Sequence, residues 1–195
     1  KLIEFFECGE TALNEDFGEY FWLSLYCRMV MPGCYAPMVL CLIGAQHCGK
    51  SYFGKRLAQI FMNDEKADTI LLDLAGDKID FLREITGNSP IASIGEMLGL
   101  NLANMNKVKD SVQRTGDPMH YKYEGHFTQP RQWVAILDGN KYEGLQRDHT
   151  GNPRFYPMFC GQDDDDSGKQ SWREDYKVSQ EKWAALVRKS GAANS

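Results

Sequence analysis

The sequence predicts an α/β fold in which a largely parallel central sheet is flanked by helices. Short apolar runs of strand length alternate with longer segments whose apolar residues recur at helical spacing. Residues 44–51, G-A-Q-H-C-G-K-S, have the spacing of a phosphate-binding loop between a strand and a helix. The apolar fraction of 43% and the charged fraction of 25% are ordinary globular values and argue against a disordered chain.

The first half of the chain is expected to begin with helix. Apolar residues recur at helical spacing through residues 1–31, and Pro32-Gly33 then breaks the chain. The run 39–43 is wholly apolar and predicts a buried strand. A helix is expected over residues 50–62 and a second strand within residues 69–74.

The second half continues the alternation of helix and strand. Residues 80–85 and 104–114 are expected to be helices, and residues 91–97 favour a strand. Alternation around Glu124-Gly125 predicts a hairpin over residues 121–128. The apolar run 133–137 predicts another buried strand.

These elements suggest four parts of the chain. Residues 1–31 form an N-terminal helical segment, and residues 32–160 form the core that carries the phosphate-binding loop. Residues 161–175 are acidic and rich in Ser and Gly, as in a mobile loop. Residues 176–195 contain an amphipathic helix that we expect to pack on the core.

Composition excludes several classes of protein. The formal net charge of −5 comes largely from the aspartates at 163–166, so it neither favours nor excludes a local nucleic-acid surface. No apolar run has the length of a membrane span, so we expect no membrane partner. The six cysteines show no C-x-x-C pair and no zinc-site spacing. We expect reduced thiols in a cytoplasmic protein.

The loop at residues 44–51 predicts binding of ATP with Mg²⁺. Its glycines allow the backbone N–H groups to wrap a phosphate. Lys50 is expected to neutralise the β and γ oxygens, and the Ser51 hydroxyl to reach the magnesium ion. The side chains of His47 and Cys48 are expected to point away from the phosphates. The predicted binding residues are Gly44, Gln46, Cys48, Gly49, Lys50, Ser51 and Tyr52.

A loop of this type also needs an acid at the end of a neighbouring strand. Asp73 ends one apolar run and Glu96 ends another, and the pattern alone does not choose between them. Asn140 follows the run 133–137 and has the amide that orients the attacking water in many ATPases of this kind. Capping of a turn is the alternative role for Asn140.

Taken together, these motifs resemble the virulence-associated protein E family. That family is the P-loop ATPase domain of phage, plasmid and pathogenicity-island replication proteins, and it is similar to the superfamily 3 helicases and other AAA+ ring ATPases. The most specific stretch is Thr150–Pro157, T-G-N-P-R-F-Y-P, which resembles a family stretch T-G-N-x-R-F-W-P. The resemblance covers nearly the whole chain and also rests on Val30–Cys34, Gly76–Lys78, Ile94–Met97, Arg114–Asp117, Pro130-Arg131 and Trp183.

The resemblance implies roles for single residues. It places Glu96 on the family's magnesium-side acid, and it places Ser93 where the family usually has a second acid. It implies that Arg154 is an arginine finger acting on a neighbouring subunit, unless it only supports the turn at Asn152. Arg114 is a second such candidate, with pairing to Asp117 as its alternative role. The Thr-Thr-Asn that usually ends the later strand is Asp138-Gly139-Asn140 here.

The resemblance also implies partners. A hexameric ring of copies is expected, with single-stranded DNA in contact with the hairpin. The side chains suited to stack on bases or meet phosphates there are Tyr121, Lys122, Tyr123 and His126, with an ordinary solvated hairpin as the alternative. An ATP-hydrolysing helicase-like motor is therefore the leading functional hypothesis. A nucleotide-binding assembly or regulatory module with little hydrolysis is the second, and a small metabolite kinase is the third.

Overall fold

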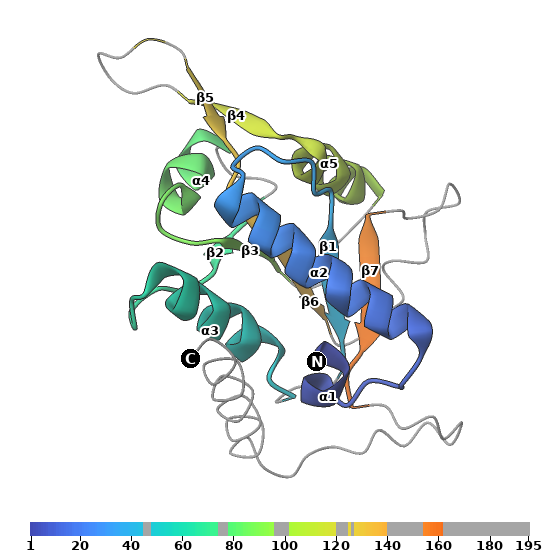
Figure 1. The fold of residues 1–195 in the computed structure, drawn as a ribbon. Helices are drawn as coiled ribbons and strands as arrows, with labels where there is room; N and C mark the ends of the chain where they lie inside the picture. The colour runs from blue at the N-terminus through green and yellow to red at the C-terminus, as the bar shows by residue number, and fades with distance from the viewer. Residues whose placement is uncertain are drawn as a thin grey trace.

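The computed structural model describes residues 1–44, 48–73, 78–95, 102–119, 125, 127–139 and 154–161. A five-stranded sheet with strand order β2-β3-β6-β1-β7 forms the centre of the molecule (Figure 1). Every neighbouring pair in this sheet is parallel, which confirms the predicted α/β class. The strands are β1 Val39–Ile43, β2 Ile70–Leu71, β3 Ile91–Ile94, β6 Val134–Gly139 and β7 Phe155–Phe159.

Helices cover both faces of this sheet. Helices α1 (Leu2–Phe6), α2 (Ala12–Val30) and α3 (Lys50–Met62) contribute to one apolar cluster. Helices α4 (Lys78–Ile85) and α5 (Leu102–Gln113) contribute to a second cluster on the other face. Figure 1 shows α2 lying diagonally across the strands. The result is a three-layer sandwich with the sheet in the middle.

Strand β1 shows how one apolar run serves both faces. Leu40 and Leu42 belong to the cluster under α1, α2 and α3, whereas Val39, Cys41 and Ile43 belong to the cluster under α4 and α5. All five side chains are buried, as expected for a central strand of a parallel sheet. The loop that follows β1 therefore leaves the sheet at its centre.

The N-terminal segment is two helices rather than one. Glu7 has a left-handed backbone with φ 51° and ends α1. The Thr11 hydroxyl then accepts a hydrogen bond from the Asn14 N–H at 3.2 Å and caps the start of α2. Helix α2 ends at Val30, next to the predicted break at Pro32-Gly33. Leu2, Phe5 and Phe6 of α1 and Phe21 and Leu25 of α2 are buried in the core.

The strands agree less closely with the sequence-based expectations. The second strand is only Ile70–Leu71, shorter than the expected range 69–74. Strand β7 was not expected, because Pro157 lies inside it. Proline removes a backbone donor and is tolerated mainly on edge strands. β7 is such an edge strand, since it pairs with β1 alone.

An antiparallel pair, β4 (Gly116–Met119) and β5 (Phe127–Pro130), lies on either side of the predicted hairpin. Of the predicted range 121–128, the structure describes only residues 125, 127 and 128. Gly116 pairs with Pro130 and Met119 with Phe127, so these strands flank the segment predicted to contact DNA. Figure 1 shows the pair at the end of the molecule opposite α1.

Within the described residues, no helix combines the length and the apolar character needed to cross a membrane.

Candidate phosphate-binding site

The predicted phosphate-binding loop connects the carboxyl end of β1 to the first residue of α3. Strand β1 lies between β6 and β7, so the carboxyl ends of three parallel strands meet around this loop. In open parallel sheets, ligands bind outside the carboxyl ends of the strands. The loop therefore occupies the part of the fold where a ligand site is expected.

Gly44 begins the loop in a space with no room for a side chain. Its N–H donates to the carbonyl of Gly139 at 3.0 Å. A Cβ atom added to Gly44 would lie 2.7 Å from the backbone oxygen of Cys160. At the far end of the loop, Gly49 caps α3 with φ 87°, a conformation that favours glycine. A larger residue is thus disfavoured at both glycines of the motif, by a close backbone contact at Gly44 and by a left-handed backbone at Gly49.

Lys50 is the first residue of α3, and only 7% of it is exposed. Its Nζ donates to the carbonyl oxygen of Gly44, the first residue of the loop, at 2.7 Å. This partner is neutral, so a phosphate oxygen in its place would gain a charge-assisted hydrogen bond. Lys50 is thus held against Gly44 at the start of the loop.

Ser51 has a partner that the sequence did not indicate. Its Oγ donates to Oδ2 of Asp138 at 2.5 Å, a distance typical of a hydroxyl bound to a carboxylate. The two residues are 87 positions apart in the chain. They meet because β6 pairs with β1 in a register that places Asp138 beside Leu42, two residues before Gly44.

Cys48 lies inside the loop, and its Sγ is 3.5 Å from Nζ of Lys50. A hydrogen bond from the Cys160 thiol and the nearby charge of Lys50 lower the pKa of Cys48 to about 6, against the opposing effect of burial. Burial and the thiol neighbours Cys48 and Cys8 raise the pKa of Cys160. The Cys48 thiol therefore faces Lys50 and the end of β7. All six cysteines are free thiols.

Tyr52, Asp73 and Ser93 are the next residues singled out by the sequence, and the structure describes all three. Tyr52 is half-buried and packs against the apolar cluster that includes α2 and α3. Asp73 is exposed after β2, at the edge of the sheet farthest from β7, and Ser93 is half-buried on β3. The predicted site residues that lie outside the described ranges are Gln46, Glu96, Asn140, Tyr121, Lys122, Tyr123 and His126.

Arg154 lies far from the loop of its own chain. It directly precedes β7, and its carbonyl accepts a hydrogen bond from the N–H of Val39 at 2.8 Å. Val39 begins β1 and Gly44 follows its end, so about 16 Å of strand separates them. Burial, and then the charge of Arg154, lower the pKa of Lys109 on α5. Arg154 is thus placed at the amino end of the sheet with a second cation nearby.

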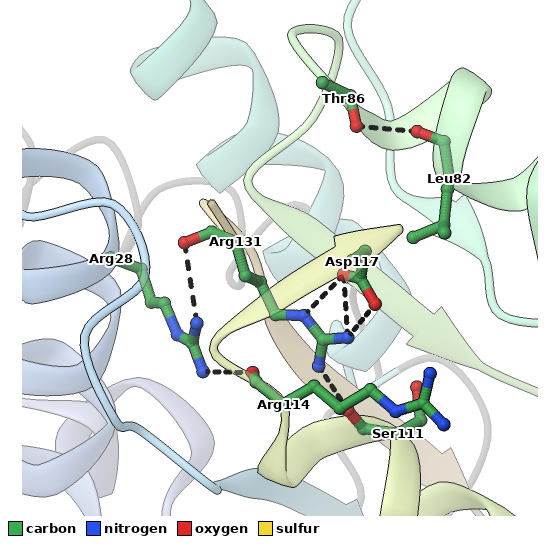
Figure 2. Close-up of polar contacts among 7 residues, drawn as sticks. All are labelled: Arg28, Leu82, Thr86, Ser111, Arg114, Asp117 and Arg131. Carbon is green, nitrogen blue, oxygen red and sulfur yellow. Dashed lines mark hydrogen bonds and ion pairs between the residues drawn. The ribbon is translucent and has the colours of Figure 1, made fainter. Parts of the chain in front are cut away.

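Arg114, the other finger candidate, is exposed just after α5. Its suggested partner Asp117 instead binds Arg131 through both carboxylate oxygens, at 2.7 to 2.9 Å (Figure 2). Arg131 also donates to the carbonyl of Ser111 and stacks its guanidinium 4.1 Å from the ring centre of Trp133. Asp117 and Arg131 form a buried structural pair that the sequence did not reveal.

Arg28 of α2 completes this cluster at the amino end of the sheet. It donates to the carbonyl of Arg114 at 3.2 Å and to the carbonyl of Arg131 at 3.5 Å (Figure 2). Burial, together with the charge of Arg131, lowers the pKa of Arg28 to about 10. The cluster joins α2, the end of α5 and the hairpin.

Comparison with known proteins gives a family and a fold. The profile of the virulence-associated protein E-like domain matches residues 1–189. No curated protein matches the chain. Three apo structures of the NrS-1 C-terminal region are similar, with TM-scores of 0.54, 0.57 and 0.58 and identities of 14%, 13% and 15%. They align with 91% of this chain, which spans 39–41% of their length. At such identity the likeness establishes the fold alone.

Proposed function

Because the chain belongs to the virulence-associated protein E-like domain family, we propose that it is the ATP-binding and ATP-hydrolysing domain of a mobile-element replication protein. The proposed fold is a P-loop NTPase of the type found in AAA+ proteins and superfamily 3 helicases. The observation that carries the proposal is the loop at the carboxyl end of β1, with buried Lys50 bound to the carbonyl of Gly44.

The residues of the loop fit a nucleotide with magnesium. Lys50 and the backbone of the loop bind the phosphates, and Ser51 offers a hydroxyl oxygen to the ion. Within the described residues, no group of three or more His, Cys, Asp or Glu side chains could hold a metal. Mg²⁺ is commonly held by few protein oxygens together with substrate phosphates. Bound Mg²⁺ neutralises charge on the β and γ oxygens.

Two further residues complete the proposed catalytic set in the same subunit. Glu96, two residues after β3 in the sequence, is proposed to face the magnesium ion and to polarise the attacking water, and Asn140, directly after β6, is proposed to orient that water. Both lie just beyond strands whose carboxyl ends are on the loop side of the sheet. The parallel pairing of β3 with β6 and of β6 with β1 supports this arrangement.

Arg154 is proposed to act on the nucleotide of a neighbouring copy. Its position at the start of β7, a strand length from its own Gly44, favours action between subunits over action within one. The assembly is proposed to be a ring, with a hexamer as the expected size. Single-stranded DNA is proposed to meet the segment between β4 and β5, through Tyr121, Lys122, Tyr123 and His126.

The first test measures ATP hydrolysis by the purified protein with and without single-stranded DNA. We expect DNA to stimulate hydrolysis and Lys50→Ala to abolish it. Loss of one charged hydrogen bond of this kind corresponds to about 2 kcal/mol, or roughly 30-fold in ATP affinity. Lys55→Ala is the matched control, because Lys55 lies on the same helix but binds the exposed Asp68. Equal activity of wild type and Lys50→Ala would contradict the proposal.

The second test mixes two inactive variants. Lys50→Ala subunits retain Arg154, and Arg154→Ala subunits retain an intact loop, so a mixed ring regains hydrolysis if Arg154 acts across the interface. The same mixture made with Arg114→Ala examines the other candidate. Particle mass with and without ATP and Mg²⁺ reports the ring, and a monomer under both conditions would rule it out.

One observation favours the alternative of a nucleotide-binding module with little hydrolysis. The described strand β3 has the sequence Ile-Ala-Ser-Ile, so Ser93 brings no charge to the loop side of the sheet. This alternative predicts ATP binding without turnover, and turnover gained on Ser93→Glu. Robust hydrolysis by the wild-type protein would exclude it.

A further inference from the structure

The bond between Ser51 and Asp138 joins the phosphate-binding loop to the carboxyl end of β6. Ser51 is the second residue of α3 and is exposed, and Asp138 is half-buried at the second-to-last position of β6. Their 2.5 Å contact is a charge-assisted hydrogen bond in which the serine hydroxyl is the donor. The proposed magnesium-binding hydroxyl is therefore oriented by a carboxylate.

The chemistry of this bond suits a cation. A hydroxyl has one proton and two lone pairs, and an ionised carboxylate only accepts. Donation of the Ser51 proton to Asp138 leaves the serine lone pairs available for a metal. The carboxylate also brings a negative charge and further oxygen lone pairs to the same place. Mg²⁺ prefers oxygen ligands and often uses one or two carboxylates with its phosphates.

The faces of the sheet show why Asp138 reaches this position. Val134 and Ile136 belong to the core cluster that also includes residues of α3. Because side chains alternate along a strand, Asp138 lies on that same face, two residues beyond Ile136. Ser93 is paired with Ile136 and also lies on this face, but without a charge. Asp73 follows β2, three strands from β1 and so about 14 Å away across the sheet.

We infer that Asp138 is a second acid on the magnesium side of this site, beside the proposed Glu96. It is carried on β6 and replaces the charge that Ser93 of β3 does not bring. The inference rests on the proposed function, because it concerns the ion that accompanies the nucleotide. Asp138 positions Ser51 and supplies charge next to it, while Glu96 keeps its proposed role at the ion and the attacking water. An uncharged Ser93 is then compatible with hydrolysis.

The test separates metal-dependent from metal-independent nucleotide binding. ATP affinity is measured by calorimetry for the wild type and Asp138→Asn, each with excess Mg²⁺ and with EDTA. Groups that orient a metal ligand typically contribute about 10- to 100-fold to metal affinity, so we expect the Mg²⁺-dependent part of ATP affinity to fall by about that factor. Affinity in EDTA is expected to stay within about twofold of the wild type. Asp73→Asn is the control, an exposed carboxylate beyond another strand of the same sheet.

Electron paramagnetic resonance of Mn²⁺ in the presence of ATP gives a second readout that does not depend on turnover. We expect less protein-bound Mn²⁺ for Asp138→Asn and no change for Asp73→Asn. An unchanged response to Mg²⁺ in Asp138→Asn would overturn the inference while leaving the proposed function intact. Equal losses of affinity with Mg²⁺ and with EDTA would show a purely structural role and also overturn it. A wild-type protein without ATP affinity would instead refute the proposed function, and the inference with it.

Discussion

The two ends of the central strands use charged side chains in different ways. At the amino end, Arg131 and Asp117 are 1% and 3% exposed and satisfy each other through two-oxygen contacts. At the carboxyl end, Lys50 binds a neutral carbonyl of its own loop, and the Ser51 hydroxyl binds Asp138. In the first pair, each charge has a charged partner buried inside the protein. At the second site, the hydrogen bonds of Lys50 and Asp138 go to groups of the phosphate-binding loop and the start of α3, where the proposed ligand would bind.

This difference separates stability from function. A buried ion pair is strongly destabilised when one partner is removed, because the other charge is left without compensation. Substitution of Lys50 or Asp138 at the carboxyl end is expected to cost little folding free energy. It is expected to weaken binding of the proposed nucleotide instead. The amino-end cluster is therefore expected to govern unfolding, and the carboxyl-end loop to govern nucleotide binding.

Asp117→Asn is expected to have the largest effect on folding. The change keeps the shape of the side chain but leaves the buried guanidinium of Arg131 without a counter-charge, at a cost of about 3–5 kcal/mol in the free energy of unfolding. Denaturant unfolding followed by circular dichroism measures it. ATP affinity of the remaining folded protein is expected to be unchanged.

The matched control replaces both partners. In the double variant Asp117→Leu with Arg131→Met, both charges of the pair are removed together. Its unfolding free energy is expected to equal that of the wild type or to exceed it, by up to about 4 kcal/mol. If the double variant were as unstable as Asp117→Asn, packing of Arg131 on Trp133 rather than its charge would dominate the cluster.

Gly44→Ala is the next largest change and affects both properties. The new Cβ would meet the carbonyl of Cys160 at 2.7 Å, and backbone atoms of β7 and the loop must move apart. Overpacking of this kind costs about 1–3 kcal/mol. ATP binding is expected to weaken as well, because the displaced loop carries Lys50.

Gly125→Ala serves as its control, since a Cβ there meets nothing within 4 Å. Its thermal unfolding is expected to stay within about 0.5 kcal/mol of the wild type. A Gly44→Ala protein with wild-type stability and affinity would contradict this prediction, because the loop would then move away from Cys160 without cost.

Local patterns were sufficient to predict the elements that build the loop. The apolar run of β1, the glycines and the amphipathic α3 are each encoded within a few residues, and α3 has the expected bounds Lys50–Met62. Strand β7 was missed because Pro157 suppresses strand patterns except at an edge, and edge position depends on the whole sheet.

The contacts between distant residues were not predictable in the same way. The Ser51–Asp138 bond depends on the register of β1 with β6. One signal was available, because the alternation of Val134 and Ile136 continues to Asp138 at the end of the strand. Choosing Arg131 rather than Arg114 as the partner of Asp117 required knowing how β4 and β5 pair. The roles of Glu96 and Asn140 remain predictions.

The third prediction concerns the reactivity of one thiol, Cys48, at the carboxyl end of the sheet. Its expected effect on the protein is smaller than that of the two preceding substitutions. The thiolate of Cys48 is the reactive form, and its pKa is lowered to about 6 by the Cys160 thiol and Lys50. Alkylation by iodoacetamide is therefore expected to rise through a midpoint near pH 6 and to fall away below it. Peptide mass spectrometry follows Cys48 separately from the half-buried Cys27 and Cys34.

Lys50→Met tests the electrostatic part of this prediction. It removes the ammonium group 3.5 Å from the Cys48 sulfur, so the midpoint of Cys48 alkylation should move to higher pH. Bound ATP is expected to slow the alkylation of Cys48 in the wild type. A midpoint near 9, the ordinary value of a thiol, would show that Cys48 does not share the electrostatics of the loop.

The smallest expected effect belongs to Lys55→Ala, which removes an ion pair exposed on both sides. Lys55 and Asp68 are 45% and 49% exposed and lie 2.7 Å apart, about as close as the buried pair of Arg131 and Asp117. Water screens the exposed charges, so the unfolding free energy should change by less than about 1 kcal/mol. The same denaturant titration measures it beside Asp117→Asn. Equal effects from the two variants would mean that burial does not decide how much an ion pair contributes to the stability of this protein. A much larger effect of Asp117→Asn, at nearly equal distance, would show that burial does.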